Sequence, residues 1–245
     1  MMFGNKKSNR LRFLAISGVA ALCLSLTACV TAEFEGDSST TGVSGTSTSD
    51  VRKLSVSGGG YGIRSIAWAE GGARGGLDKP CYMKVEFKSL SDSFETDGND
   101  TVYKEINVCN SSSYNNGSMK TTRLAFQNLE MYLNEIRSCD SKRGANDRIK
   151  GITMWGAFVT GVEPDGSDYT CSTQTSGSHE YTFEGACSDA EVRSDTESRT
   201  NCGDWNGLRS CPSGMLASEL WVHVSDDNEF VGLQLNCQEV DFDSE

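Results

Sequence analysis

The sequence predicts an all-β domain with approximate threefold repetition, rich in disulfides and preceded by a flexible N-terminal tether. Three observations lead to this fold class. An acidic turn followed by an alternating strand occurs three times, the 245-residue chain contains 10 cysteines, and a small polar stretch follows a hydrophobic N-terminus. The 26 glycines and 3 prolines agree with short strands separated by turns. Hydrophobic residues make up 37% of the chain, which is enough for one buried core at this length.

Residues 1–28 have the organisation of a bacterial export signal. Met1–Arg12 contains basic residues and no acidic one, and Phe13–Leu26 is apolar but too short to cross a bilayer comfortably. The stretch therefore predicts a signal peptide and export into an oxidising compartment.

The last residues of this segment, Leu26-Thr27-Ala28-Cys29, resemble the lipobox of bacterial lipoproteins. The resemblance implies cleavage before Cys29, acylation of that cysteine and a membrane lipid as partner. An ordinary secretory signal cut after Ala28 is the alternative. Because Val30 rather than Asp follows the cysteine, we expect a lipid-anchored protein of the bacterial cell envelope, on the outer membrane if the cell is Gram-negative.

Residues 29–53 are predicted to form the tether. Ser38–Gly42 and Ser44–Asp50 are small and polar, and they contain almost no residue that could contribute to a core. Such a composition cannot bury enough apolar surface to become ordered on its own, so a flexible spacer is expected. Residues 54–245 are then left as a single β domain.

The cysteines predict disulfides. Setting aside Cys23 of the signal and Cys29 leaves eight of the 10, an even number in an exported protein. Zinc is the alternative, but the chain has no C-x-x-C pair and neither histidine lies at ligand spacing from two cysteines. The eight are Cys81, Cys109, Cys139, Cys171, Cys187, Cys202, Cys211 and Cys237.

The repeat is a turn rich in Asp and Asn followed by a strand with alternating apolar residues. The turns are Asn99–Asp100, Asn146–Asp147 and Asp226–Glu229. Alternation places the apolar residues of each strand on one buried face. An alternating strand also precedes the first and third turns, and the segment before the second fits either a strand or a helix, of which repetition favours the strand. The apolar pairs are Ile106/Val108, Ile152/Met154 and Leu233/Leu235, and we expect Ile106, Ile152 and Leu233 to be equivalent core positions.

The last repeat resembles that of the vitelline membrane outer layer protein I family. The matching residues are Gly203-Asp204-Trp205, Cys211-Pro212-Ser213-Gly214, Leu220–Val224 and Gly232–Cys237. The resemblance implies a β-prism of three sheets around a pseudo-threefold axis. Family members are extracellular and disulfide-rich, and they are discussed as coat components and oligosaccharide binders.

The family pattern also implies two disulfide pairings, Cys211 with Cys237 and Cys81 with Cys109. In each case the bond would join two strands of one repeat. The sequence departs from the family where Cys202 stands at the first Trp position of Trp-Gly-x-Trp, and where Pro80-Cys81 replaces Cys-Pro. The resemblance covers about 35 residues and weakens outside them.

The net charge and the absence of two sequence motifs exclude some classes of function. The formal charge is −12, and an acidic surface repels phosphate, so no nucleic acid partner is expected. A nucleophile elbow and a phosphate-binding loop are absent from the sequence. We therefore expect a binding module for an extracellular glycan or a protein, and not an enzyme. A structural envelope or coat component with no small ligand, and a carbohydrate-active enzyme using two carboxylates, are the alternatives.

The candidate ligand-binding residues are one surface aromatic and the polar residues of the repeat turns. Trp221 alternates with apolar neighbours and is therefore expected on the outer face, together with His223. No metal or cofactor is expected, although the clustered oxygens of the turns leave calcium open. The turn residues are Asp100, Asp147, Asp227 and Asn228.

Overall fold

The computed structural model describes residues 30–58, 60–71, 79–90, 101–109, 114–126, 129–141, 148–158, 174–176, 179–181, 193–199 and 202–244. Predictions for the signal segment, Cys29, Cys171, Cys187, Asp100 and Asp147 lie outside these ranges. Strands account for nearly all of the described secondary structure, with one 3-10 turn, η2, at Asn116–Ser118. The described ranges include no helix that is both long and apolar enough to span a membrane.

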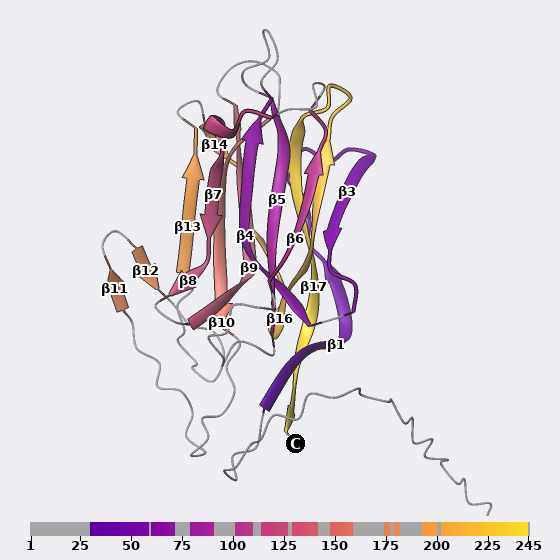
Figure 1. The fold of residues 1–245 in the computed structure, drawn as a ribbon, viewed down its shortest axis with the longest axis vertical. Helices are drawn as coiled ribbons and strands as arrows, with labels where there is room; N and C mark the ends of the chain where they lie inside the picture. The colour runs from indigo at the N-terminus through magenta and orange to yellow at the C-terminus, as the bar shows by residue number, and fades with distance from the viewer. Residues whose placement is uncertain are drawn as a thin grey trace, which may run out of the picture.

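The domain consists of three antiparallel sheets whose strands run along its long axis (Figure 1). A separate short pair is formed by β11 (Gln174–Ser176) and β12 (His179–Tyr181). Sheet A contains β1 (Val30–Thr40), β2 (Ser44–Gly45), β3 (Asp50–Ser55), β16 (Met215–Val224) and β17 (Phe230–Ser244). Sheet B contains β4 (Tyr61–Glu70), β5 (Pro80–Ser89), β6 (Thr101–Asn107) and β7 (Lys120–Arg123). Sheet C contains β8 (Ala125–Phe126), β9 (Leu129–Ser141), β10 (Ile149–Phe158), β13 (Arg193–Ser198), β14 (Cys202–Trp205) and β15 (Arg209–Ser210).

Each predicted repeat is a hairpin in a different sheet. The first is β5–β6, the second β9–β10 and the third β16–β17. The ambiguous segment before the second turn is a strand, as repetition favoured, because it supplies the central strand of sheet C. The all-β, β-prism-like fold with approximate threefold repetition is therefore confirmed.

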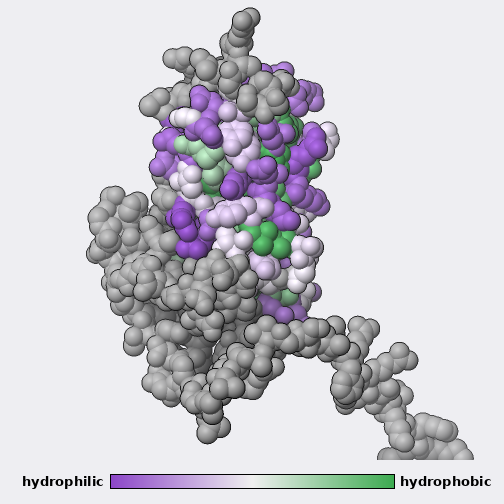
Figure 2. Space-filling model, viewed as in Figure 1, coloured by the Kyte–Doolittle hydropathy of each residue, from purple (hydrophilic) through white to green (hydrophobic). Residues whose placement is uncertain are grey.

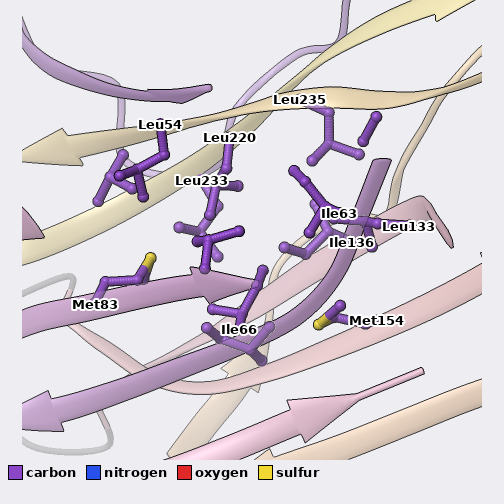
Figure 3. Close-up of a cluster of buried hydrophobic side chains, with 14 of the residues drawn as sticks. Leu54, Ile63, Ile66, Met83, Leu133, Ile136, Met154, Leu220, Leu233 and Leu235 are labelled. Atoms are coloured by element: carbon purple, nitrogen blue, oxygen red, sulfur yellow. The ribbon is translucent and has the colours of Figure 1, made fainter. Parts of the chain in front are cut away.

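One core fills the space between the three sheets (Figure 3). The strands β4, β9 and β16 contact one another, so each sheet packs against the other two. Ile66, Met154 and Leu220 come from different sheets and are completely buried in this core. The sheets therefore depend on one another for burial, which explains why no single repeat could form a stable unit alone.

The predicted equivalence of the three repeat positions is only partly right. Ile152 and Leu233 are completely buried. Ile106 is half-buried and packs against the margin of the core, because β6 is an edge strand of sheet B. The sequence alternation correctly identified the inward face of β6 but not its place in the sheet.

The prediction of a flexible linker over residues 29–53 is wrong for residues 30–53. β1 pairs along β17, β2 pairs with the same strand, and β3 pairs with β16. Phe34 packs in a second, smaller apolar cluster, and the hydroxyl of buried Ser44 accepts the Ser138 amide proton at 2.8 Å. A Ser/Thr-rich segment is ordered here because the exposed edges of an existing sheet satisfy its backbone groups.

The two implied disulfides are confirmed. Cys81–Cys109 joins the hairpin β5–β6, and Cys211–Cys237 joins the segment before β16 to β17. A further bond, Cys139–Cys202, ties β9 to β14 in sheet C and was left open by the sequence. Among the described residues, every cysteine of the predicted set is thus in a disulfide.

One buried carboxylate links the three sheets at one end of the prism. Glu229, just before β17, is 2% exposed. Its Oε1 lies 2.7 Å from the Nζ of Lys79 at the start of β5, and its Oε2 contacts Nε of Arg148 at the start of β10. The three sheets thus each contribute one charged group to a single ion cluster.

Candidate functional site

Each sheet presents an aromatic ring beneath a cationic side chain on its outer face. Strand alternation explains the placement, because the side chains of these residues point to the face of each sheet opposite to the core. Part of this surface is hydrophilic over sheet B (Figure 2). The contacts, measured to ring centroids, are Lys53–Trp221 at 3.7 Å on sheet A, Lys84–Tyr103 at 4.1 Å on sheet B, and Arg137 with Trp155 and Trp205 at 5.1 and 4.8 Å on sheet C.

The predicted surface residue Trp221 lies on the outer face of sheet A and is half-buried. Its neighbours in sequence, Leu220 and Val222, are completely buried on the opposite face. The indole Nε1 donates a hydrogen bond to the carboxylate of Glu219 at 2.6 Å, and Lys53, its cross-strand partner on β3, covers one ring face. The ring therefore has a fixed orientation, with an anion at its edge and a cation over its face.

Cross-strand pairing surrounds Trp221 with groups that can bind hydroxyls. We call this set the Trp221 patch. Because paired residues lie on the same face of a sheet, the register defines its members. They are Lys53 and Ser55 of β3, Glu219 and Trp221 of β16, and Gln234 and Asn236 of β17.

The patch contains one acid and one base, so its formal charge is zero despite the charge of −12 on the chain. Gln234 is already bonded, because its Nε2 donates to the Thr41 carbonyl at 2.6 Å. Asn236, Ser55 and the second carboxylate oxygen of Glu219 supply further donors and acceptors on the same face. An aromatic plane bordered by such groups suits a ligand with both CH faces and hydroxyls.

His223 occupies the outer face of sheet A together with Trp221, as predicted. The segment between β2 and β3 covers it there, so it is only 3% exposed. The Thr48 amide donates to Nδ1 at 3.0 Å, and Nε2 lies 3.3 Å from the Oε1 of Gln234. His223 thus holds the N-terminal segment against sheet A instead of facing a ligand.

The third repeat turn has a structural explanation for its polar residues. Asp227 and Asn228 are exposed, and Asn228 has a φ of 58°, in the left-handed region that Asn adopts more readily than most residues. The Asn228 amide donates to the Ser225 carbonyl at 2.9 Å, which closes the turn. Glu229 turns inward to its ion cluster, whereas Asp226 and Asp227 of the same turn are exposed. No described group of three or more His, Cys, Asp or Glu residues could hold a metal ion.

One alternative function was a carbohydrate-active enzyme that uses two carboxylates, so the contacts of each buried carboxylate matter. Three glutamates in the described ranges are buried: Glu70, Glu86 and Glu229. Glu86 lies 3.7 Å from Nη1 of Arg64 and 3.4 Å from Nη2 of Arg123, and Glu70 lies 2.8 Å from the Lys150 ammonium. Each of these acids is therefore held in an ion pair. The pairs of Glu70 and Glu229 join different sheets, whereas those of Glu86 lie within sheet B.

A hydrogen-bonded tyrosine pair lies on sheet B. The Tyr82 and Tyr114 rings are stacked with centroids 3.7 Å apart. Burial raises the pKa of Tyr82 well above its ordinary value, and the hydrogen bond from its hydroxyl to Glu105 at 2.8 Å raises it further. The hydroxyl therefore stays protonated in neutral solution and acts as a donor.

Sequence reasoning did not identify the aromatic–cation group on sheet C. Trp205 is half-buried on the outer face, next to the backbone of Gly151. The sequence did contain one indication of this group, because Trp155 directly follows the buried Met154 and its side chain must therefore point outward. Only the pairing of β9 with β10 and β14 brings Arg137 between the two tryptophans.

Comparison with family models and with curated proteins found no match to this sequence. Among solved structures, the agglutinin of Calystegia sepium is similar with a TM-score of 0.47 and 8% identity, over 84% of this chain and 99% of that chain. The Calsepa lectin in complex with a biantennary N-glycan has a TM-score of 0.45 and 9% identity, over the same shares. Neither similarity identifies a functional residue in this chain.

Proposed function

We propose that this protein is a lipid-anchored, non-catalytic module of the bacterial cell envelope that binds a glycan through the Trp221 patch. The observation that carries the proposal is the oriented Trp221 ring with Glu219, Ser55 and Asn236 on the same face. The CH face of a sugar ring packs on an indole, while its hydroxyls donate to the carboxylate and exchange hydrogen bonds with the amide and the serine.

Lys53 would leave the ring face when a sugar binds. The lysine is exposed, and a cation–π contact at an exposed site is worth only about 0.5–1 kcal/mol. Its long side chain can instead reach a hydroxyl at the margin of the ligand. The patch therefore needs a change in one flexible side chain and none in the backbone.

The distribution of apolar groups favours a glycan over a protein partner. Among the described residues, the only large hydrophobic side chains that are exposed are Tyr103 and Leu208. Protein interfaces normally contain a contiguous apolar centre, which two separate residues do not provide. A polar surface with single aromatic rings is better suited to sugars.

The lipid anchor would lie far from this patch. Val30, which follows Cys29 directly, pairs with Ser244 near the end of β17, whereas the patch residue Gln234 lies ten residues earlier on that strand. At roughly 3.3 Å per residue, the patch is about 30 Å along the strand from the anchored end. A β strand rather than a flexible spacer would thus hold the binding surface away from the membrane.

A glycan array on the full-length protein in detergent micelles tests the binding site. We expect wild type to bind a defined set of glycans, and Trp221→Ala to lose them with an unchanged melting temperature. Tyr103→Ala, which removes the ring on sheet B, is the matched control and should bind as wild type. An array without any bound glycan would favour the structural envelope component instead.

A separate experiment tests the anchor. Cys29→Ser should release the protein from the membrane fraction, and intact wild-type protein should carry an acyl mass on the peptide that begins with Cys29. A wild-type protein without that mass, together with a Ser variant that still sediments with membranes, would contradict lipid anchoring.

A further inference from the structure

The guanidinium of Arg137 lies between two tryptophan rings without any polar partner. Its Cζ is 5.1 Å from the Trp155 centroid and 4.8 Å from the Trp205 centroid. Within the described ranges Arg137 makes no hydrogen bond or ion pair, and its Nε is buried without an acceptor. A guanidinium has five N–H donors, and only Nε is buried without an acceptor, so the donors on the two Nη atoms remain for solvent or a ligand.

The sheet fixes this group before any ligand arrives. Trp205 lies opposite Cys139 in the pairing of β14 with β9, and the Cys139–Cys202 disulfide holds these two strands together. Gly151 leaves room for the indole, because a Cβ at that position would be 3.2 Å from a Trp205 ring atom. Trp155 is held by the pairing of β10 with β9. The two rings and the cation are therefore preorganised.

We propose that Arg137, Trp155 and Trp205 form a second binding site, which takes the carboxylate of an acidic sugar. The planar guanidinium matches a carboxylate with two parallel hydrogen bonds, an interaction that lysine cannot reproduce. The flanking rings hold the cation in place and offer faces for the sugar carbons. The carboxylate accepts from the two Nη groups of Arg137, because the buried Nε is out of reach of a ligand.

Neighbouring charges make this site selective. Glu135 lies on the same face and pairs across the strands with Trp155. Its carboxylate repels a second negative charge, so the site favours one carboxylate against Arg137 over a highly charged ligand. The paired indoles likewise favour a sugar over an acidic peptide, whose backbone offers no comparable flat CH face.

The site lies on sheet C and shares no residue with the Trp221 patch on sheet A. The inference therefore does not rest on glycan binding at that patch. Loss of binding by Trp221→Ala and loss of binding by an Arg137 variant are separate results, and each can occur without the other.

Isothermal titration of the full-length protein with an oligosaccharide that carries a single galacturonate residue, and with the methyl ester of that residue, tests the proposal. The ester keeps the sugar rings and removes the charge. We expect the acid to bind at least tenfold more tightly than the ester. Arg137→Gln should reduce affinity for the acid to that for the ester, and Arg137→Lys should recover only part of it. Tyr103→Ala, on the exposed face of sheet B and outside both proposed sites, is the control and should leave the acid affinity unchanged.

Three outcomes would overturn the proposal: equal affinity of wild type for acid and ester, unchanged acid affinity in Arg137→Gln, or equally tight binding of an oligoglutamate peptide. The comparison of acid with ester uses wild-type protein alone, so it remains decisive if a variant fails to fold. Quenching of indole fluorescence by the acid in wild type, reduced in Trp155→Phe, gives a second readout that locates the ligand.

Discussion

Glu70→Gln should destabilise the domain strongly, because it removes the carboxylate that pairs with a buried ammonium. The Lys150 side chain is completely buried, and its Nζ lies 2.8 Å from Oε1 of Glu70, whose side chain is 8% exposed. Arg199 lies 3.6 Å from the same oxygen, and its Nε and Nη2 are buried without acceptors. Glutamine keeps the shape of the side chain but removes the only carboxylate in this described cluster.

The expected magnitude follows from the burial. Breaking a buried ion pair by removing one partner typically costs about 3–5 kcal/mol. For a domain of this size each kcal/mol corresponds to roughly 2–4 °C in melting temperature, so Glu70→Gln should lower it by about 10 °C. Combining Glu70→Leu with Lys150→Met removes both charges and should recover much of the loss.

Urea unfolding followed by tryptophan fluorescence, together with calorimetry, measures the effect. The matched control is Asp50→Asn, which breaks the pair with Arg52 at 2.8 Å, where both side chains are about half exposed. Surface pairs contribute about 0–1 kcal/mol, so this variant should unfold almost as wild type does. If Glu70→Gln and Asp50→Asn changed the free energy of unfolding equally, the reasoning from burial would be refuted.

Three further results are expected. Replacing both Cys211 and Cys237 with serine opens a loop of 26 residues and should cost about 3 kcal/mol, measured by urea unfolding; an unchanged midpoint would contradict a stabilising cross-link. Leu233→Ala should cost about 2–5 kcal/mol and Ile106→Ala clearly less, because only the former side chain is completely buried; calorimetry that reversed this order would refute the edge-strand explanation. His223→Ala should speed hydrogen exchange of the amide that its ring accepts, measured by mass spectrometry, whereas exchange at the wild-type rate would show that the ring does not hold the N-terminal segment.

The repeats and two of the disulfides were predictable because they depend on local patterns. The alternation of Ile152 with Met154 identifies an inward face from a few residues, since neighbouring side chains in a strand point to opposite sides. The resemblance in the last repeat was enough to pair Cys211 with Cys237, and the structure confirms it.

The N-terminal segment shows where composition misleads. Residues 30–53 contain few core formers, yet Phe34 and Ser44 are buried because this segment adds to a sheet made by the end of the chain. Disorder was predicted from what the segment can bury alone. Its actual partner, β17, lies about 200 residues away in sequence, and local composition carries no information about such pairing.

The sequence by itself determined the all-β class, the three hairpins, the inward face of their strands and the outward phase of Trp221, because these follow from the two-residue period of a strand. Only the tertiary structure decided which strands became edges, that His223 was covered, and that Arg137 came to lie between Trp155 and Trp205. Those features depend on the register between distant strands. Register is set by the joint packing of three sheets around one core, a property of the whole chain and of no single segment.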